Sequence, residues 1–147
     1  MASDLSIFVD KTKLNIRVGV IIRRANEFII EVSKIGENSV IPGGRIKIGE
    51  SSIDALVRET REEMGFEIKK EKAIFKTCIE NFFNYHGTDC HELFFLYEYE
   101  LDDGEYESLK SIGDNKDNEY NCFKFLPKDG FDGYNLLPLQ VHDLIRQ

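Results

Sequence analysis

Residues 42–66, PGGRIKIGESSIDALVRETREEMGF, combine a glycine-rich turn with the clearest helical pattern in the chain. Ser51 and Ser52 are typical helix N-cap residues and Gly65 is a typical C-cap, so the pattern predicts a helix over residues 51–64. On a helical wheel, one stripe about 100° wide is apolar apart from a threonine, and we expect it to face the core. This stripe comprises Ile53, Leu56, Val57, Thr60 and Met64.

A second sector of the same helix gathers three carboxylates, Glu59, Glu62 and Glu63, and is bordered by Ala55 and Arg58. A charged helical face is most often simply solvated. Here, however, Glu59 and Glu63 form an i, i+4 pair of like charges, which destabilises an isolated helix by roughly 0.2–0.5 kcal/mol. They also lie in the C-terminal half, where the helix dipole disfavours anions. A bound dication would turn this repulsion into coordination, and oxygen ligands alone indicate Mg²⁺ or Mn²⁺.

Length and composition limit the class of protein. A chain of 147 residues predicts one domain, residues 1–147, and a hydrophobic content of 41% argues against disorder. The net charge of -8 counts against binding to a nucleic acid polymer, although a metal ion could still bring a phosphorylated small molecule to the surface. The N-terminus lacks a signal-peptide pattern, no apolar run is long enough to span a membrane, and the three cysteines are isolated. These features predict a cytoplasmic protein without membrane partners.

The remaining patterns alternate between strands and helices. The segment LNIRVGVIIR (14–23) and the segment FIIEVSK (28–34) predict a β-hairpin. Further strands are expected within residues 66–83, 91–101 and 120–127, and a second helix within residues 136–146, with Pro138 near its first turn. This order favours an α/β fold with helices on the faces of a mixed sheet.

The stretch from Gly44 to Phe66 resembles the Nudix box, which reads Gly, five residues, Glu, seven residues, then Arg-Glu-U-x-Glu-Glu-x-Gly-U, where U is a bulky apolar residue. Gly44, Glu50, Arg58 and the glutamates of the acidic sector all occupy fixed positions of this pattern. Thr60 is the one departure, since an apolar residue is usual there. The resemblance implies a Nudix-type α/β/α sandwich with a mixed β-sheet.

The resemblance also implies an activity, the hydrolysis of the pyrophosphate bond in a nucleoside diphosphate linked to a moiety X, with Mg²⁺ or Mn²⁺ as cofactor. Glu59, Glu62 and Glu63 would be metal ligands, with one of them acting as base. Gly44 would offer its backbone to the metal or to a phosphate, and Glu50 would assist from the loop. Arg58 would orient the glutamates through charge-assisted hydrogen bonds.

The identity of X is open, and so is the set of residues that would bind it. The absence of proline between Pro42 and Pro127 counts against the ADP-ribose type of Nudix enzyme. Aromatic residues downstream of the box, in ENFFNY (80–85), resemble the dinucleoside polyphosphate type, and aromatic faces can stack on a base. The candidate substrate-binding residues are Arg17, Phe82, Phe83, Tyr85 and Glu119, each of which has an ordinary packing or surface role as its alternative.

Three functions therefore compete. The sequence favours a hydrolase of nucleoside triphosphates, including oxidised ones, whose partner is a small nucleotide. A dinucleoside polyphosphate hydrolase comes next, and a nucleotide-binding Nudix module without turnover is the third alternative. A homodimer is compatible with the sequence, but no segment identifies an interface.

Overall fold

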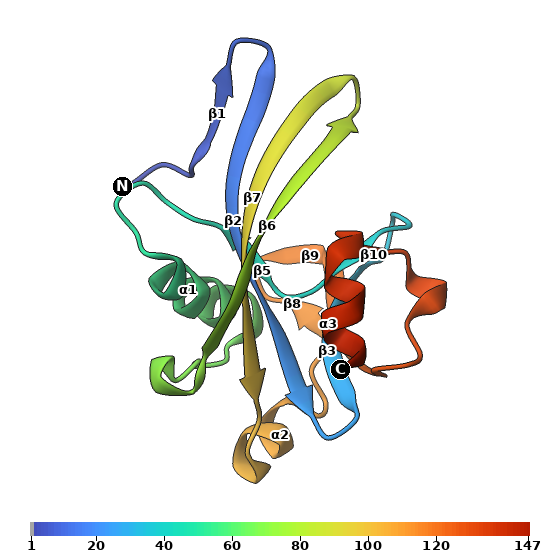
Figure 1. Cartoon of the computed structure of the whole chain (residues 1–147). Coiled ribbons are helices and arrows are strands. Elements are labelled where there is room, and N and C mark those ends of the chain that lie inside the picture. The colour runs from blue at the N-terminus through green and yellow to red at the C-terminus, as the bar shows by residue number, and fades with distance from the viewer. Residues whose placement is uncertain (1) are drawn as a thin grey trace.

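The computed structural model describes residues 2–147 and consists of a curved mixed β-sheet with helices on both of its faces (Figure 1). The central strand β2 (Thr12–Arg24) pairs in parallel with β7 (Thr88–Glu100) and antiparallel with β1 (Ser6–Val9). Strand β6 (Ile74–Tyr85) pairs with β7 at the edge of the sheet. The mixed sheet predicted from the alternation of strand and helix patterns is thus confirmed.

The sheet splits beside β2. Strand β3 (Glu27–Ser33) pairs with β2 only next to their connecting turn, and the two strands then diverge. The short strand β5 (Gly43–Arg45) pairs with β2, whereas β4 (Ser39–Val40) pairs with β3. The chain between β4 and β5 therefore crosses from one half of the sheet to the other.

Beyond β3 the sheet continues with strands from the C-terminal part of the chain. Strand β9 (Asn118–Pro127) runs antiparallel to β3 and pairs with β8 (Asp114–Asn115), while β10 (Leu136–Leu137) runs parallel to β4. A helix covers each face: α1 (Ser52–Met64) lies on one side and α3 (His142–Arg146) on the other, as Figure 1 shows. This arrangement confirms the expected α/β/α sandwich.

Each face of the sheet has its own hydrophobic core, because successive side chains of β2 point to opposite faces. Val18, Val20 and Ile22 pack with the apolar side of α1, and Ile21 packs with residues of the C-terminal segment, including Ile145. All five side chains are fully buried. The apolar run at residues 18–22 of β2 therefore reflects a part of the strand that is covered on both faces.

Helix α1 begins and ends where its sequence predicts. The Ser51 hydroxyl accepts a hydrogen bond from the Asp54 backbone N–H, and Gly65 ends the helix in a left-handed conformation with a φ of 66°. Of the predicted core stripe, Leu56, Thr60 and Met64 are buried, and the other two members are half-buried. The hydroxyl of buried Thr60 donates to the Leu56 carbonyl, which satisfies the polar group that replaces the usual apolar residue. Ala55, which borders the acidic sector on the helical wheel, is fully buried as well.

Two hairpins extend from the sheet as long arms (Figure 1). The first joins β1 to β2, and the sequence patterns did not predict β1. The second joins β6 to β7 through a two-residue turn in which His86 and Gly87 both have positive φ, 50° and 86°. Such turns match the right-handed twist of the paired strands.

Other local expectations needed correction. Residues 66–73 do not form a strand; they run as coil with a 3₁₀ turn at Lys70–Lys72, and β6 begins only at Ile74. The acidic stretch 102–119, in which the sequence allows no more than a short helical turn, contains the two-turn helix α2 (Asp103–Leu109), which begins with a capping box. The C-terminal helix is shorter than expected, since Pro138 precedes a 3₁₀ turn and α3 starts four residues later. None of the helices in residues 2–147 has the length and apolar character that crossing a membrane requires.

Candidate active site

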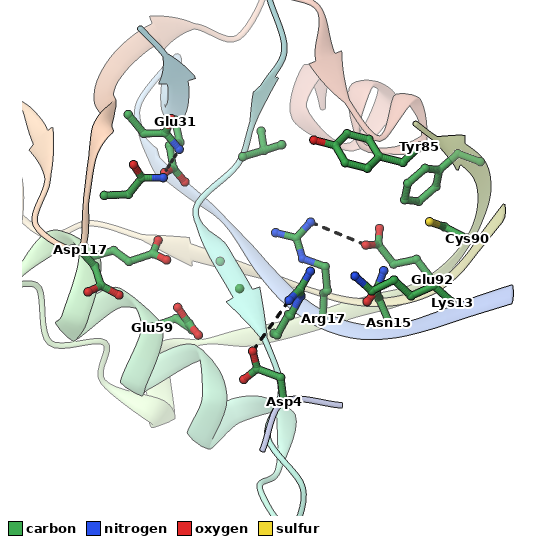
Figure 2. A pocket seen from close by; sticks show the side chains of 18 of the residues that line it. Asp4, Lys13, Asn15, Arg17, Glu31, Glu59, Tyr85, Cys90, Glu92 and Asp117 are labelled. Carbon is green, nitrogen blue, oxygen red and sulfur yellow. Dashed lines mark hydrogen bonds and ion pairs between the residues drawn. The ribbon is translucent and has the colours of Figure 1, made fainter. Parts of the chain in front are cut away.

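A pocket of about 830 Å³ lies at the split in the sheet. Its lining comes from α1, from the divergent strands β2 and β3, from the β4–β5 crossing and from both hairpin arms. Figure 2 shows carboxylates at one end, among them Glu31, Glu59 and Asp117, and Tyr85, Cys90 and Glu92 at the other, with Arg17 between the two groups. The pocket therefore has an acidic end and an aromatic end.

Arg58 organises the carboxylates on the α1 side. Its guanidinium donates to both carboxylate oxygens of Glu50, at 2.8 and 3.0 Å, and to Glu59 at 2.8 Å. It also donates to the Arg45 carbonyl at 2.9 Å, so this one side chain links α1 to β5 and to the loop that carries Glu50. The hydrogen bond to Glu50 raises the pKa of Arg58 further above its usual value, and the same bond lowers the pKa of Glu50. This geometry is the bidentate arrangement that arginine favours.

Glu62 plays a more peripheral part in this network. Its carboxylate accepts from Arg58 at 3.4 Å, and its side chain is 46% exposed, against 12% for Glu59. Glu62 is absent from the pocket lining, where Glu59 and Glu63 are both found. Of the three glutamates singled out in the sequence, the structure thus brings two into the pocket and leaves the third at its outer margin.

The glycine turn lies directly against the Glu59 carboxylate. A Cβ atom on Gly44 would come within 2.4 Å of Glu59 Cδ, and a Cβ on Gly43 within 2.1 Å of the Val18 carbonyl oxygen. Gly43 therefore requires glycine, because its Cβ would meet backbone atoms, whereas a Cβ on Gly44 would have to displace the Glu59 carboxylate. The close approach places the backbone of Gly44 beside a carboxylate in the pocket wall.

Glu63 has the carboxylates of Glu31 and Glu59 as neighbours, and the charge of Arg17 offsets them only in part. Burial, followed by the neighbouring charges of Glu31 and Glu59, raises the pKa of Glu63 to about 9. Glu31 projects from β3, is 7% exposed, and accepts hydrogen bonds from the side-chain amides of Asn115 at 2.7 Å and Asn121 at 2.9 Å. The acidic end is therefore a place where negative charge is concentrated and incompletely compensated.

This donor set fits a hard divalent cation. Within residues 2–147, no three His, Cys, Asp or Glu side chains are already drawn together at metal-binding distances. The chemistry nevertheless agrees with Mg²⁺ or Mn²⁺, because the carboxylates of Glu59, Glu63 and Glu31 and the backbone of Gly44 offer only oxygen ligands. The crowding of Glu31 and Glu59 around Glu63, which raises the pKa of Glu63, indicates a cluster that a cation would stabilise.

The candidate substrate residues separate into two groups. Arg17, Phe83 and Tyr85 line the pocket, with Arg17 forming an ion pair with Glu92 at 3.6 Å. Phe82 points to the opposite face of β6, where its ring lies 4.5 Å from that of His91 and 66% of the residue is exposed. Glu119 is exposed on β9 and does not contribute to the lining, whereas Asp117, two residues earlier, does.

Several pocket residues were missed by the sequence patterns: Glu31, Asn15, Glu92 and Asp117. Three of them interrupt apolar strands, as Glu31 does in FIIEV, and are at least 93% buried. A buried polar side chain within a strand is unusual enough to signal a site. Alternation alone could not reveal it, because which face of each strand borders a pocket depends on the tertiary fold.

The fold, together with the carboxylate helix that follows the glycine turn, places this chain in the class of Nudix pyrophosphohydrolases. The NUDIX domain family model matches residues 13–136, and the chain belongs to this family. No curated protein matches the chain in sequence.

Solved structures resemble the chain over most of its length. A MutT Nudix hydrolase from Burkholderia pseudomallei has a TM-score of 0.68 at 16% identity, covering 91% of this chain and 97% of its own. The mMutator MutT protein from Bacillus halodurans also has a TM-score of 0.68 at 16% identity, covering 90% and 80%. An Ap4A hydrolase from C. elegans has a TM-score of 0.56 at 19% identity, covering 90% and 94%. At these identities the likeness concerns the fold.

Proposed function

We propose that the protein is a divalent-metal-dependent hydrolase of the pyrophosphate bond in a nucleoside diphosphate linked to X, with nucleoside triphosphates, including oxidised ones, as its preferred substrates. The observation that carries the proposal is the polarity of a single pocket. Carboxylates suited to a dication occupy one end, and exposed aromatic rings occupy the other. A nucleotide has the matching polarity, with charged phosphates at one end and a flat base at the other.

Glu59 and Glu63, together with the backbone carbonyl of Gly44, would hold Mg²⁺ or Mn²⁺, and Glu62 would join them from the margin of the pocket. When bound, the metal would neutralise charge on the pyrophosphate and lower the pKa of water. Arg58 holds Glu59 in place and, through Glu50, fixes the loop that precedes the helix. A carboxylate of the cluster accepts the proton of the attacking water.

Arg17 is placed to bind phosphate between the two ends of the pocket. Its side chain is 30% exposed, and within residues 2–147 its guanidinium forms the 3.6 Å ion pair with Glu92 but no side-chain hydrogen bond. Phe83 and Tyr85 offer the faces on which a base can stack.

A dinucleoside polyphosphate is the second candidate substrate. The presence of Tyr85 in the pocket favours it, because tyrosine is the aromatic residue usual in that type of Nudix enzyme. The structural likeness to an Ap4A hydrolase is compatible with either substrate.

The test is an assay of phosphate and pyrophosphate release from triphosphates and dinucleoside polyphosphates with Mg²⁺, with Mn²⁺ and with a chelator. We expect metal-dependent turnover that falls about a thousandfold in Glu63→Gln, because such a group acts where charge develops. Glu71→Gln, an exposed residue beyond the helix, serves as the matched control and should behave like the wild type. Binding of nucleotides without turnover on any substrate would instead identify a nucleotide-binding module.

A further inference from the structure

The aromatic end of the pocket contains a buried carboxylate that the hydrolytic chemistry does not use. Glu92 lies on β7, its side chain is 5% exposed, and it lines the pocket. Its one charged partner is Arg17, at 3.6 Å, which is longer than a hydrogen bond. Among residues 2–147, no donor lies within hydrogen-bond distance of its oxygens. Because no solvent-sealed polar side-chain atom in residues 2–147 lacks a hydrogen-bond partner, the Glu92 oxygens must be open to the pocket, where a ligand can supply the missing donors.

Asn15 lies beside Glu92 and presents the complementary group. The two residues are register partners in the parallel pairing of β2 with β7, so their side chains share one face of the sheet. The Ser6 hydroxyl donates to Asn15 Oδ1 at 2.6 Å, which fixes the amide. The Asn15 Nδ2 group has no acceptor within residues 2–147 and remains free to donate into the pocket. This part of the pocket thus offers the Asn15 amide donor next to the two acceptor oxygens of Glu92, with Arg17 and Lys13 also in the lining.

The aromatic residues stand over this pair. Phe83 is the cross-strand partner of Cys90 on β7, two residues from Glu92, and Tyr85 follows two residues further along the same face of β6. Phe83 is 38% exposed and Tyr85 is 62% exposed, so both rings have free surface. A planar ligand held against either ring would turn its edge toward the polar pair.

We propose that Glu92 and Asn15 are specificity residues that select guanine as the base. Guanine presents two adjacent donors, N1–H and the N2 amine, which a carboxylate can accept side by side, and next to them the O6 acceptor, which suits Asn15 Nδ2. Adenine and cytosine each place a ring-nitrogen acceptor where guanine has N1–H, which would oppose the carboxylate. This inference rests on the proposed function, because it places a nucleotide in the same pocket.

Calorimetric titration of the metal-free protein with GMP, IMP and AMP tests the inference independently of turnover. IMP differs from GMP only in lacking the N2 amine. We expect GMP to bind about tenfold more tightly than IMP, as the loss of one hydrogen bond to a charged group implies, and AMP to bind more weakly than both. Equal affinities for the three ligands, or a preference for AMP, would overturn the inference. This series needs no variant and so does not depend on the folding of one.

Substitutions then assign the preference to the two residues. In Glu92→Gln the discrimination between GMP and IMP should shrink to about twofold or less, since the charge-assisted hydrogen bond is lost. In Asn15→Asp the affinity for GMP should fall about tenfold, because an acceptor would face O6. Glu80→Gln makes the same chemical change on an exposed residue of β6 that does not line the pocket, and should retain the wild-type preference. If Glu92→Gln kept full discrimination, the assignment would be wrong.

Kinetics separate this inference from the proposed function. With GTP and ITP as substrates, Glu92→Gln should raise KM for GTP about tenfold with kcat nearly unchanged, because the base lies away from the reacting phosphorus. Equal KM values for GTP, ITP and ATP with intact turnover would refute the guanine assignment and leave the hydrolase standing. Selective binding of GMP without hydrolysis of any triphosphate would refute the hydrolase and leave the base site standing.

Discussion

Two regions of the molecule build a network around buried or half-buried carboxylates, and they do so in different ways. At α2, Glu105 accepts hydrogen bonds from the Tyr99 hydroxyl, the Lys72 ammonium and the Asp102 backbone N–H. At α1, Arg58 pairs with Glu50 and Glu59, but Glu63 accepts no hydrogen bond from a cation in residues 2–147, and burial together with the charge of Glu31 raises its pKa.

The pKa values express this difference. Burial alone would raise the pKa of Glu105, but its donors outweigh burial and hold the pKa below its usual value. Burial and carboxylate neighbours raise the pKa of Glu63 to about 9. A network that supplies every charge with a partner stabilises the fold, whereas one that leaves charges facing each other keeps a place for a ligand. Three substitutions test this contrast.

The largest effect is expected at the glycine turn. Gly44→Ala would place a methyl group against the Glu59 carboxylate and displace the carboxylate by about 1 Å. Because such a misplacement costs about a hundredfold in rate, we expect activity to fall by that factor. Because the displaced group is the end of a side chain, the Tm should change little. Gly133→Ala, at a glycine with open space around it, is the control for kinetics and melting. Unchanged activity in Gly44→Ala would show that the position of Glu59 does not matter.

A smaller effect on activity is expected from Glu31→Gln. The amide keeps the shape and can still contact Asn115 and Asn121, but it removes one negative charge from the acidic end. We expect activity or Mg²⁺ affinity to fall about ten- to a hundredfold, which is typical of groups that support metal ligands. The metal-free protein should at the same time melt at a higher temperature than the wild type, since Glu63 would lose a repulsive neighbour. A lower Tm without metal would contradict the view of this cluster as repulsive.

The smallest effect on activity is expected from Glu105→Gln, which should leave turnover unchanged and lower the Tm by a few degrees, about 2–4 °C for each kcal/mol lost. The sign of its pH dependence follows from the lowered pKa. The carboxylate contributes stability above the unfolded-state pKa near 4.5, and this contribution is lost as pH falls through the folded-state pKa. The difference in Tm between wild type and variant should therefore be largest at neutral pH and shrink below pH 4.5. A constant difference across this range would show that the charge of Glu105 is not what stabilises α2.

Sequence patterns predicted the parts of the molecule whose signals are local. The caps and apolar stripe of α1 are encoded within the helix, and the alternation in β2, β3 and β7 is encoded within each strand. The glycine turn and Arg58 were singled out because the Nudix box fixes the number of residues between them. In contrast, β1 was missed because its exposed residues Ile7, Phe8 and Val9 gave no alternation between apolar and polar positions.

The residues that escaped prediction depend on long-range pairing. Glu31 becomes part of the acidic end because β3 diverges from β2 and faces α1, and Glu92 joins Asn15 because β7 pairs with β2 in parallel. Neither the divergence of β3 from β2 nor the pairing of β7 with β2 can be inferred from the residues next to Glu31 or Glu92. The same holds for Phe82 and Phe83, which are adjacent in sequence but lie on opposite faces of β6, so that only Phe83 lines the pocket.

In each of the two projecting hairpins, one strand lines the pocket near the tip and packs in the hydrophobic core at its other end. Strands β2 and β7 run in parallel from the tips of the two arms into the hydrophobic core, β2 past Asn15 and Arg17 and β7 past Cys90 and Glu92. Mutations near the tips can therefore reshape the far wall of the pocket while the buried part of each strand continues to hold the helix with the glutamates. A scaffold of this kind can acquire new substrates by small changes in its arms and keep the same bond-breaking end throughout.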